Sequence, residues 1–124
     1  MGKKNIKAMK TVLITEDDPA IMDALEIVFT RSGYKVLTYP NGSALLVNDF
    51  DKPDLFLIDR QLSGVDGLDI CRHLKTNPDT SEIPVIIFSA SPHVYNHAIA
   101  AGANDFIEKP FSNKAVLELV ARYI

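Results

Sequence analysis

Short apolar runs alternate with longer amphipathic segments along almost the whole chain. Five runs have the composition and length of β-strands: Thr11–Thr15, Lys35–Tyr39, Asp54–Ile58, Val85–Phe88 and Asp105–Glu108. The first, third and fourth are almost continuously apolar, so we expect them at the centre of a sheet that is covered on both faces. The second and fifth alternate more between apolar and polar residues, which favours positions nearer the sheet edges.

Helix signals occupy the segments between these runs. Asp18 and Pro19 form an N-cap and a first-turn proline, and Ser32-Gly33 ends the helix that they begin. Four more helices are predicted: Ser43 to Phe50, Leu68 to Thr76, Pro92 to Ala101, and one that begins after Ser112 and runs to the C-terminus. Alternating strands and helices predict an α/β fold, a single doubly wound (βα)5 three-layer sandwich around a parallel sheet. A reversal of strand order would leave a crevice at the carboxyl ends of the first and third strands.

Composition narrows the class of protein. With 124 residues, 47% of them hydrophobic and 23% charged, the chain fits one globular domain, and no apolar run is long enough to span a membrane. Residues 1–10 carry four lysines and no signal-peptide core, so we expect a disordered basic extension before a folded domain of residues 11–124, and a cytoplasmic location. A net charge of −3 leaves no broad basic surface for direct nucleic-acid binding.

Polar side chains stand where four of the strands end. They are Glu16, Asp17 and Asp18 after the first strand, Asp59 after the third, Ser89 after the fourth, and Lys109 after the fifth. Because the carboxyl ends of parallel strands meet at one edge of a sheet, we expect these groups to lie together. The lone cysteine, Cys71, stands in a helical stretch and is expected to be buried.

A cluster of carboxylates predicts a cation, because neighbouring negative charges repel one another unless they are neutralised. An all-oxygen site with two or three carboxylates suits Mg²⁺ or Mn²⁺. Such a metal lets an anionic phosphodonor approach an anionic acceptor, and Asp59 is the obvious acceptor at the end of the most buried strand. Lys109 would pair with the phosphoryl oxygens opposite the metal, and Ser89 could bind another of them only after transfer.

From about Thr11 to Ile124 the sequence resembles the receiver domain of two-component response regulators, including single-domain receivers of the chemotaxis type. The resemblance rests on the segments Val12–Pro19, Asp54–Asp59, Asp66-Gly67, Pro84–Ala90, Gly102-Ala103 and Lys109-Pro110-Phe111. It implies a flavodoxin-like fold with the strand order 2-1-3-4-5. It also implies a domain that catalyses only its own phosphoryl transfer and autodephosphorylation, and that is otherwise not an enzyme.

The resemblance also assigns roles to the metal ligands. Glu16 and Asp17 take the acidic-pair positions, with Asp17 as the direct ligand of Mg²⁺. Asp59 is the phosphoacceptor and a ligand, and the backbone carbonyl of Gln61 completes the set. In the loop that follows, Leu62-Ser63 stands where the family usually has Met-Pro, which bears on the rigidity of this loop.

The implied output is a conformational switch. Ser89 takes the switch hydroxyl position, and Phe106 takes the switch aromatic position without the hydroxyl of the frequent tyrosine. The Lys109-Pro110 bond is expected to be cis. Phosphorylation by a sensor histidine kinase or a histidine phosphotransfer protein would then alter the face formed by the last two helices and the last strand, where a target protein or a second copy would bind.

Other functions are considered for the same residues. A haloacid-dehalogenase-type phosphatase needs a second aspartate two residues after the first, where this chain has Gln61. A flavodoxin-like cofactor site needs a phosphate-binding loop after the first strand, but Glu16-Asp17-Asp18 would repel phosphate. A receiver-like interaction module that works without phosphorylation is the remaining alternative. The sequence ends with the fifth predicted helix, so we expect no output domain within these 124 residues.

Overall fold

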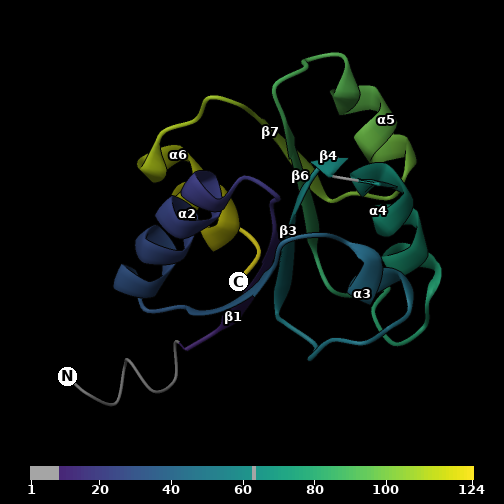
Figure 1. Cartoon of the computed structure of the whole chain (residues 1–124), viewed down its shortest axis with the longest axis horizontal. Coiled ribbons are helices and arrows are strands. Elements are labelled where there is room, and N and C mark those ends of the chain that lie inside the picture. Colours follow the sequence, from purple (N-terminus) through teal and green to yellow (C-terminus); the bar gives the residue numbers. More distant parts are fainter. Residues whose placement is uncertain (1–8, 63) are drawn as a thin grey trace.

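Five parallel strands form a sheet between two layers of helices in a computed structural model that describes residues 9–62 and 64–124 (Figure 1). The strands are β1 (Thr11–Thr15), β2 (Lys35–Tyr39), β3 (Leu55–Asp59), β6 (Val85–Ser89) and β7 (Asp105–Glu108). Their order is β2-β1-β3-β6-β7, which is the predicted order 2-1-3-4-5 and confirms the fold class. The apolar strands β1, β3 and β6 are central, as predicted. Most of the expected basic extension, residues 1–8, lies outside the described residues.

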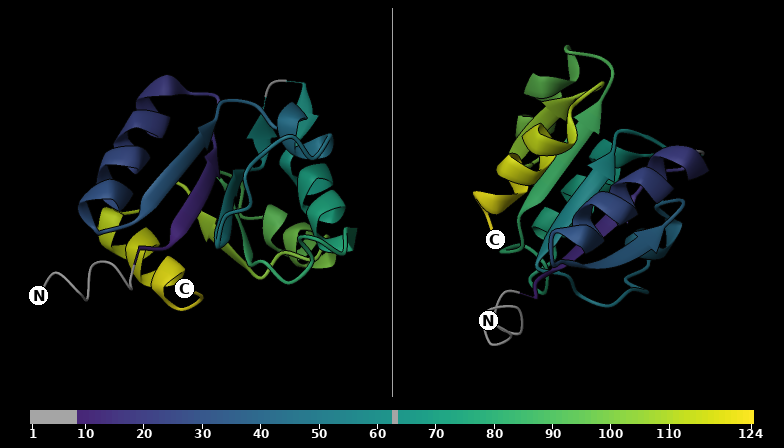
Figure 2. Two further views of the ribbon diagram at one scale, coloured as in Figure 1. Left: turned by 90° about the horizontal axis from the view of Figure 1, so that it is seen from below. Right: turned by 90° about the vertical axis from the view of Figure 1, so that its left-hand side faces the viewer.

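Helices cover both faces of the sheet. The two layers are seen edge-on in Figure 1 and from two further directions in Figure 2. One layer contains α2 (Pro19–Arg31) and α6 (Asn113–Ala121), and the other contains α3 (Ser43–Leu46), α4 (Gly67–Thr76) and α5 (Val94–Ala100). Neighbouring strand residues therefore face different cores: Val12 and Ile14 pack toward α2, while Leu13 packs toward α4. Most residues of both cores are fully buried, and each fully buried Val, Leu, Ile or Phe side chain contributes about 1.5–3 kcal/mol.

The helix caps are those that the sequence predicts. The Asp18 carboxylate accepts a hydrogen bond from the Ala20 amide at 2.9 Å, and Pro19 begins α2. Gly33 follows the end of α2 with φ +93, a conformation that side chains with a Cβ rarely adopt. The Ser112 hydroxyl accepts a hydrogen bond from the Ala115 amide at 3.0 Å and begins α6.

Two helices end at least three residues earlier than predicted, and the helix predicted from Pro92 to Ala101 spans only Val94–Ala100. The helix after residue 42 ends at Leu46 and not at Phe50, because Asn48 takes a left-handed conformation with φ +60. The Asn48 side chain is held by His73 and by Asn77, 2.8 and 3.2 Å away. The last helix ends at Ala121 and does not reach the C-terminus.

The shifts in the strand bounds are small. β3 and β6 each include one residue more than predicted at the carboxyl end, so Asp59 and Ser89 are strand residues. The structure adds a short antiparallel hairpin, β4 (Gln61–Leu62) and β5 (Val65–Asp66), directly after β3. The sequence analysis treated this segment as a loop.

Candidate acidic phosphoacceptor site

The polar groups predicted at the strand ends lie together at the carboxyl edge of the sheet. Glu16 follows β1, Asp59 ends β3, Ser89 ends β6 and Lys109 follows β7. Pairing between neighbouring strands fixes this proximity, since Thr15 is opposite Ile58 and Ser89 is opposite Glu108. The residues Glu16, Asp59 and Ser89 are only 2–3% exposed. Buried polar groups of this kind need partners, because burial without hydrogen bonds is costly.

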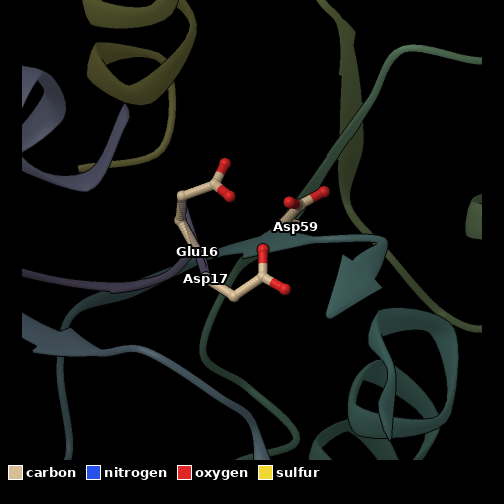
Figure 3. A group of neighbouring side chains, drawn as sticks. All are labelled: Glu16, Asp17 and Asp59. Carbon is tan, nitrogen blue, oxygen red and sulfur yellow. The ribbon is translucent and has the colours of Figure 1, made fainter. Parts of the chain in front are cut away.

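Three carboxylates form the centre of the site. Glu16, Asp17 and Asp59 each place an oxygen within 4.8 Å of the others, and Figure 3 shows their carboxyl groups around one common space. Asp17 is exposed to solvent, whereas the other two are buried. Hard oxygen ligands at this spacing, with one side open to water, fit Mg²⁺ or a similar divalent cation. The three predicted carboxylate ligands therefore come together in the fold.

Lys109 bridges the two buried carboxylates. Its Nζ donates to Glu16 Oε1 at 3.1 Å and to Asp59 Oδ2 at 3.2 Å, and it lies 4.9 Å from the centre of the Phe88 ring. The Lys109-Pro110 peptide bond is cis, as the resemblance implies. Burial alone would lower the pKa of Lys109, but the hydrogen bonds and negative charges of Glu16 and Asp59 outweigh it, and the pKa is raised.

The pKa of Glu16 is shifted by the surroundings of its carboxyl group. Burial raises the pKa of Glu16 above its ordinary value, and the negative charge of Asp59 adds to this effect. A hydrogen bond from the Asp18 amide to Glu16 Oε2, at 3.0 Å, and the contact with Lys109 oppose it. The net shift is upward, so the site holds negative charge at some cost in the absence of a further cation.

Backbone amides complete the hydrogen bonds of the site. Asp59 Oδ1 accepts from the Gln61 amide at 3.1 Å, so the two oxygens of Asp59 have different partners. Ser89 Oγ accepts from the Ser91 amide at 3.1 Å. The sequence analysis predicted a role for the backbone carbonyl of Gln61 but not for its amide. The role assigned to its carbonyl stays a prediction.

Phe106 lies beside an aromatic side chain that the sequence analysis did not pair with it. The rings of Phe106, in β7, and Tyr95, in α5, meet edge to face with centroids 6.1 Å apart. Tyr95 is 50% exposed, and Phe106 is partly buried on the side of the sheet that α4 and α5 cover. Residues eleven positions apart on different elements form this contact, and no local sequence pattern indicates it.

Comparisons with known proteins agree on one family. The model of the response regulator receiver domain matches residues 12–121. The transcriptional regulatory protein CseB of Streptomyces coelicolor is 38% identical over 114 residues, which cover 90% of this chain and 46% of CseB. The chain thus spans about half the length of the curated relatives that it matches.

Solved structures show the same fold. The receiver domain of a signal transduction histidine kinase from Syntrophus aciditrophicus is similar with a TM-score of 0.83 and 32% identity, covering 92% of this chain and 89% of that one. The receiver domain of a sensor histidine kinase from Pseudomonas aeruginosa PAO1, described with a magnesium ion in its active site cleft, has a TM-score of 0.84 at 24% identity. The two chains are covered to 94% and 98%. No helix of the described residues is both long and apolar enough to span a bilayer.

Proposed function

Because this chain belongs to the response regulator receiver domain family, we propose that it accepts a phosphoryl group on Asp59 from a sensor histidine kinase or a histidine phosphotransfer protein. The observation that carries the proposal is the setting of Asp59: a buried carboxylate with Lys109 on one oxygen, the Gln61 amide on the other, and two acidic neighbours. Receiver domains are regulatory proteins and not classical enzymes, so the product is the modified domain itself.

The residues of the site divide the transfer among them. An Asp59 oxygen attacks phosphorus, and the bond from phosphorus to the donor nitrogen breaks. The Lys109 ammonium, now 3.2 Å from Asp59 Oδ2, would stabilise the charge on a phosphoryl oxygen. Ser89 would donate its hydroxyl proton to another phosphoryl oxygen. Water near the exposed Asp17 could later attack phosphorus, and this attack would give the autodephosphorylation that we also propose.

The acidic ligands would hold Mg²⁺, or Mn²⁺ in its place. Glu16, Asp17 and Asp59 would supply carboxylate oxygens, and the Gln61 backbone carbonyl would supply one more. A bound Mg²⁺ neutralises negative charge where donor and acceptor meet. The magnesium ion named for the Pseudomonas receiver domain supports the same assignment for this chain.

The output would be a shift between two conformations of the domain. Contact of Ser89 with the phosphoryl group would change the segment between β6 and α5, and Phe106 would move with it. We propose that the face formed by α5, β7 and α6 binds a target protein or a second copy of the chain. This face includes the exposed side chains of Tyr95 and Ile99.

The partners of this chain are proposed to be proteins in the cytoplasm. The expectation of no direct nucleic-acid contact concerns only these 124 residues, and it stays a prediction. CseB is named as a transcriptional regulatory protein, and the match covers less than half of it. A longer protein that contains this domain is therefore not expected to be free of nucleic-acid contacts.

Intact-mass spectrometry tests the proposed function. The folded chain is incubated with acetyl phosphate and Mg²⁺, beside a sample with EDTA, Asp59→Asn, and Asp69→Asn as a control on the exposed side of α4. We expect a gain of one phosphoryl mass that needs the metal, is lost in Asp59→Asn and persists in Asp69→Asn. A folded wild-type chain that gains no mass would overturn the proposal and favour the phosphorylation-independent interaction module.

A further inference from the structure

We propose that the ion pair between Arg60 and Asp66 positions the Gln61 backbone for metal binding. The inference rests on the proposed function, because it concerns the same cation. It assigns a positioning role to two residues that do not themselves belong to the predicted ligands. Leu62-Ser63 lacks the proline that usually restricts this loop in similar receivers, so the loop needs another contact to fix its backbone.

The backbone of Gln61 already reaches the site. Its amide donates to Asp59 Oδ1 at 3.1 Å, so a small displacement of Gln61 changes the surroundings of the acceptor carboxylate. Gln61 is held from the other side by strand pairing, because it is opposite Asp66 in the hairpin of β4 and β5. The geometry of Gln61 therefore depends on where Asp66 lies.

Asp66 connects this hairpin to two rigid elements. Its Oδ1 accepts a hydrogen bond from the Leu68 amide at 2.9 Å, so Asp66 is the N-cap of α4. Its Oδ2 lies 3.5 Å from Arg60 Nη2. Arg60 is in turn anchored to the sheet, since its amide donates to the Phe88 carbonyl at 3.0 Å. The ion pair thus links the residue that follows β3 to the residue that precedes α4, and Gln61 lies in the short segment between these two residues.

The loop is folded back tightly on the backbone of the acceptor. The Gly67 amide donates to the Arg60 carbonyl at 2.9 Å. A Cβ placed on Gly67 would be 2.2 Å from the Asp59 carbonyl oxygen and 2.8 Å from the Arg60 Cα. Any movement at Asp66 or Gly67 is therefore transmitted to the backbone on which the acceptor stands, because these atoms are in direct contact.

The exposure of the pair predicts where its effect is measurable. The side chains of Arg60 and Asp66 are 34% and 37% exposed, and ion pairs at such sites add little to the free energy of unfolding. Residues that orient metal ligands from outside, in contrast, commonly change metal affinity by about tenfold or more. We therefore expect an effect on Mg²⁺ affinity without a matching effect on stability.

The direction in which Mg²⁺ affinity changes distinguishes a positioning role of Arg60 from a purely electrostatic one. Arg60 is a positive charge one residue from Asp59, so removing it should strengthen cation binding if its charge alone mattered. Loss of a positioning contact should weaken binding instead. Asp66→Asn removes a negative charge, which weakens binding on either account, so Arg60→Met is the decisive variant and Asp66→Asn is used only in combination with it.

Calorimetric titration of the full chain with Mg²⁺ tests the inference. The variants are Arg60→Met, Asp66→Asn, their combination, and Arg72→Met, which breaks the exposed 2.7 Å pair between Arg72 and Asp69 elsewhere in α4. We expect Arg60→Met to raise the Mg²⁺ dissociation constant about tenfold. Arg72→Met should bind like the wild type, and the double variant should lose less than the sum of the single losses.

Thermal unfolding without metal is the second measurement, and Arg60→Met should shift the midpoint no more than Arg72→Met does. Mg²⁺ affinity in Arg60→Met equal to or above that of the wild type, or strictly additive losses, would overturn the inference. If Arg60→Met did not fold, Arg60→Gln, which also removes the positive charge, replaces it in the same cycle with the same criterion. A wild-type chain that binds no Mg²⁺ would instead remove the proposed function on which the inference rests.

Discussion

The ammonium nitrogen of Lys109 lies 3.2 Å from Asp59 Oδ2, although the two residues are 50 positions apart in the chain. The same nitrogen is 3.1 Å from Glu16 Oε1. Asp59 and Glu16 are almost fully buried, and two buried carboxylates repel each other strongly unless a cation lies between them. Lys109 therefore has a part in the folded state before any donor arrives, in addition to its proposed part in transfer.

Replacing Lys109 should make the fold depend on metal. In Lys109→Met the two carboxylates lose their shared cation, so we expect the metal-free protein to be destabilised by about 2 kcal/mol. Mg²⁺ should then raise the thermal unfolding midpoint more in the variant than in the wild type. Circular dichroism in EDTA and in Mg²⁺ measures both effects, with Lys114→Met on α6 as the control. Equal Mg²⁺ shifts in the two proteins would contradict this prediction.

The raised pKa of Glu16 predicts a pH-dependent metal affinity. Burial is the main cause of the shift, and the charge of Asp59 adds to it. A carboxyl group with a raised pKa binds a proton at a higher pH than an ordinary glutamate, and that proton competes with Mg²⁺. Affinity should therefore begin to fall with decreasing pH above the range in which an ordinary glutamate, with a pKa of 4.5, is protonated, and it should fall less in Glu16→Gln. Parallel pH profiles of the two proteins would count against Glu16 as the titrating ligand.

Gly67 should be less tolerant of alanine than Gly42. A Cβ on Gly67 would meet backbone atoms of Asp59 and Arg60, which cannot move without displacing the Asp59 carboxylate. A Cβ on Gly42 would meet the end of the Ile70 side chain, which can rotate away. We expect Gly67→Ala to be destabilised by about 2 kcal/mol or more, and Gly42→Ala by clearly less. Urea unfolding of both variants measures the difference, and similar losses would refute the argument from the backbone.

The strands and the site were predictable from the sequence because both depend on local patterns. Continuous apolar runs identify β1, β3 and β6, and the polar residue that follows each run lies at the same sheet edge. This rule brings Glu16 and Asp59 to one edge, and Lys109 joins them because it follows β7, which the alternating run Asp105–Glu108 predicts. The strand order itself came from the resemblance, since periodicity does not distinguish the possible orders of parallel strands.

The parts that were not predicted depend on contacts between distant segments or lie in elements too short to show a pattern. The helix that begins at Ser43 ends early because Asn48 is held by His73 and Asn77, which are 25 and 29 positions away. Asn48 is a weak local signal of this end, because asparagine tolerates a left-handed conformation, but the apolar residues as far as Phe50 continue a helical pattern. The hairpin of β4 and β5 has two residues in each strand, too few for an alternating pattern to be recognised.

Cys71 should be unreactive in the folded protein. Its side chain is fully buried, and burial raises the pKa of the thiol to about 11, with Lys75 and Arg72 opposing the shift. Thiolate is the reactive form, so we expect slow labelling by a thiol reagent in native buffer and rapid labelling in denaturant. Labelling at equal rates in both conditions would show that the core on this side of the sheet opens readily.

The same thiol predicts a loss of stability in alkali. The pKa of Cys71 is higher in the folded state than its ordinary value of 9.0, so its contribution is complete below about pH 9 and disappears as the pH rises through about 11. The free energy of unfolding should thus fall more steeply with pH in the wild type than in Cys71→Ala. Urea unfolding at a series of pH values measures the two slopes, and equal slopes would contradict the assignment to Cys71.

Tyr95 should report the proposed switch. Its ring lies edge to face against Phe106, with centroids 6.1 Å apart, so movement of Phe106 must change the magnetic surroundings of Tyr95. Tyr34 is a matched control, because it makes the same kind of contact with Phe29, at 5.5 Å, on the opposite face of the sheet. The chain has four tyrosines and no tryptophan, so selective labelling of tyrosine rings gives a simple NMR spectrum.

With acetyl phosphate and Mg²⁺, the ring signals of Tyr95 should shift and those of Tyr34 should stay in place. Asp59→Asn should abolish the shift of Tyr95, because no phosphoryl group then draws on Ser89. Tyr95→Leu assigns the signal and also removes the edge-to-face contact, which is worth about 0.5–1.5 kcal/mol. If mass spectrometry showed phosphorylation while the Tyr95 signals did not move, Phe106 would not be the moving aromatic residue. A different face of the domain would then have to change on phosphorylation and bind the target.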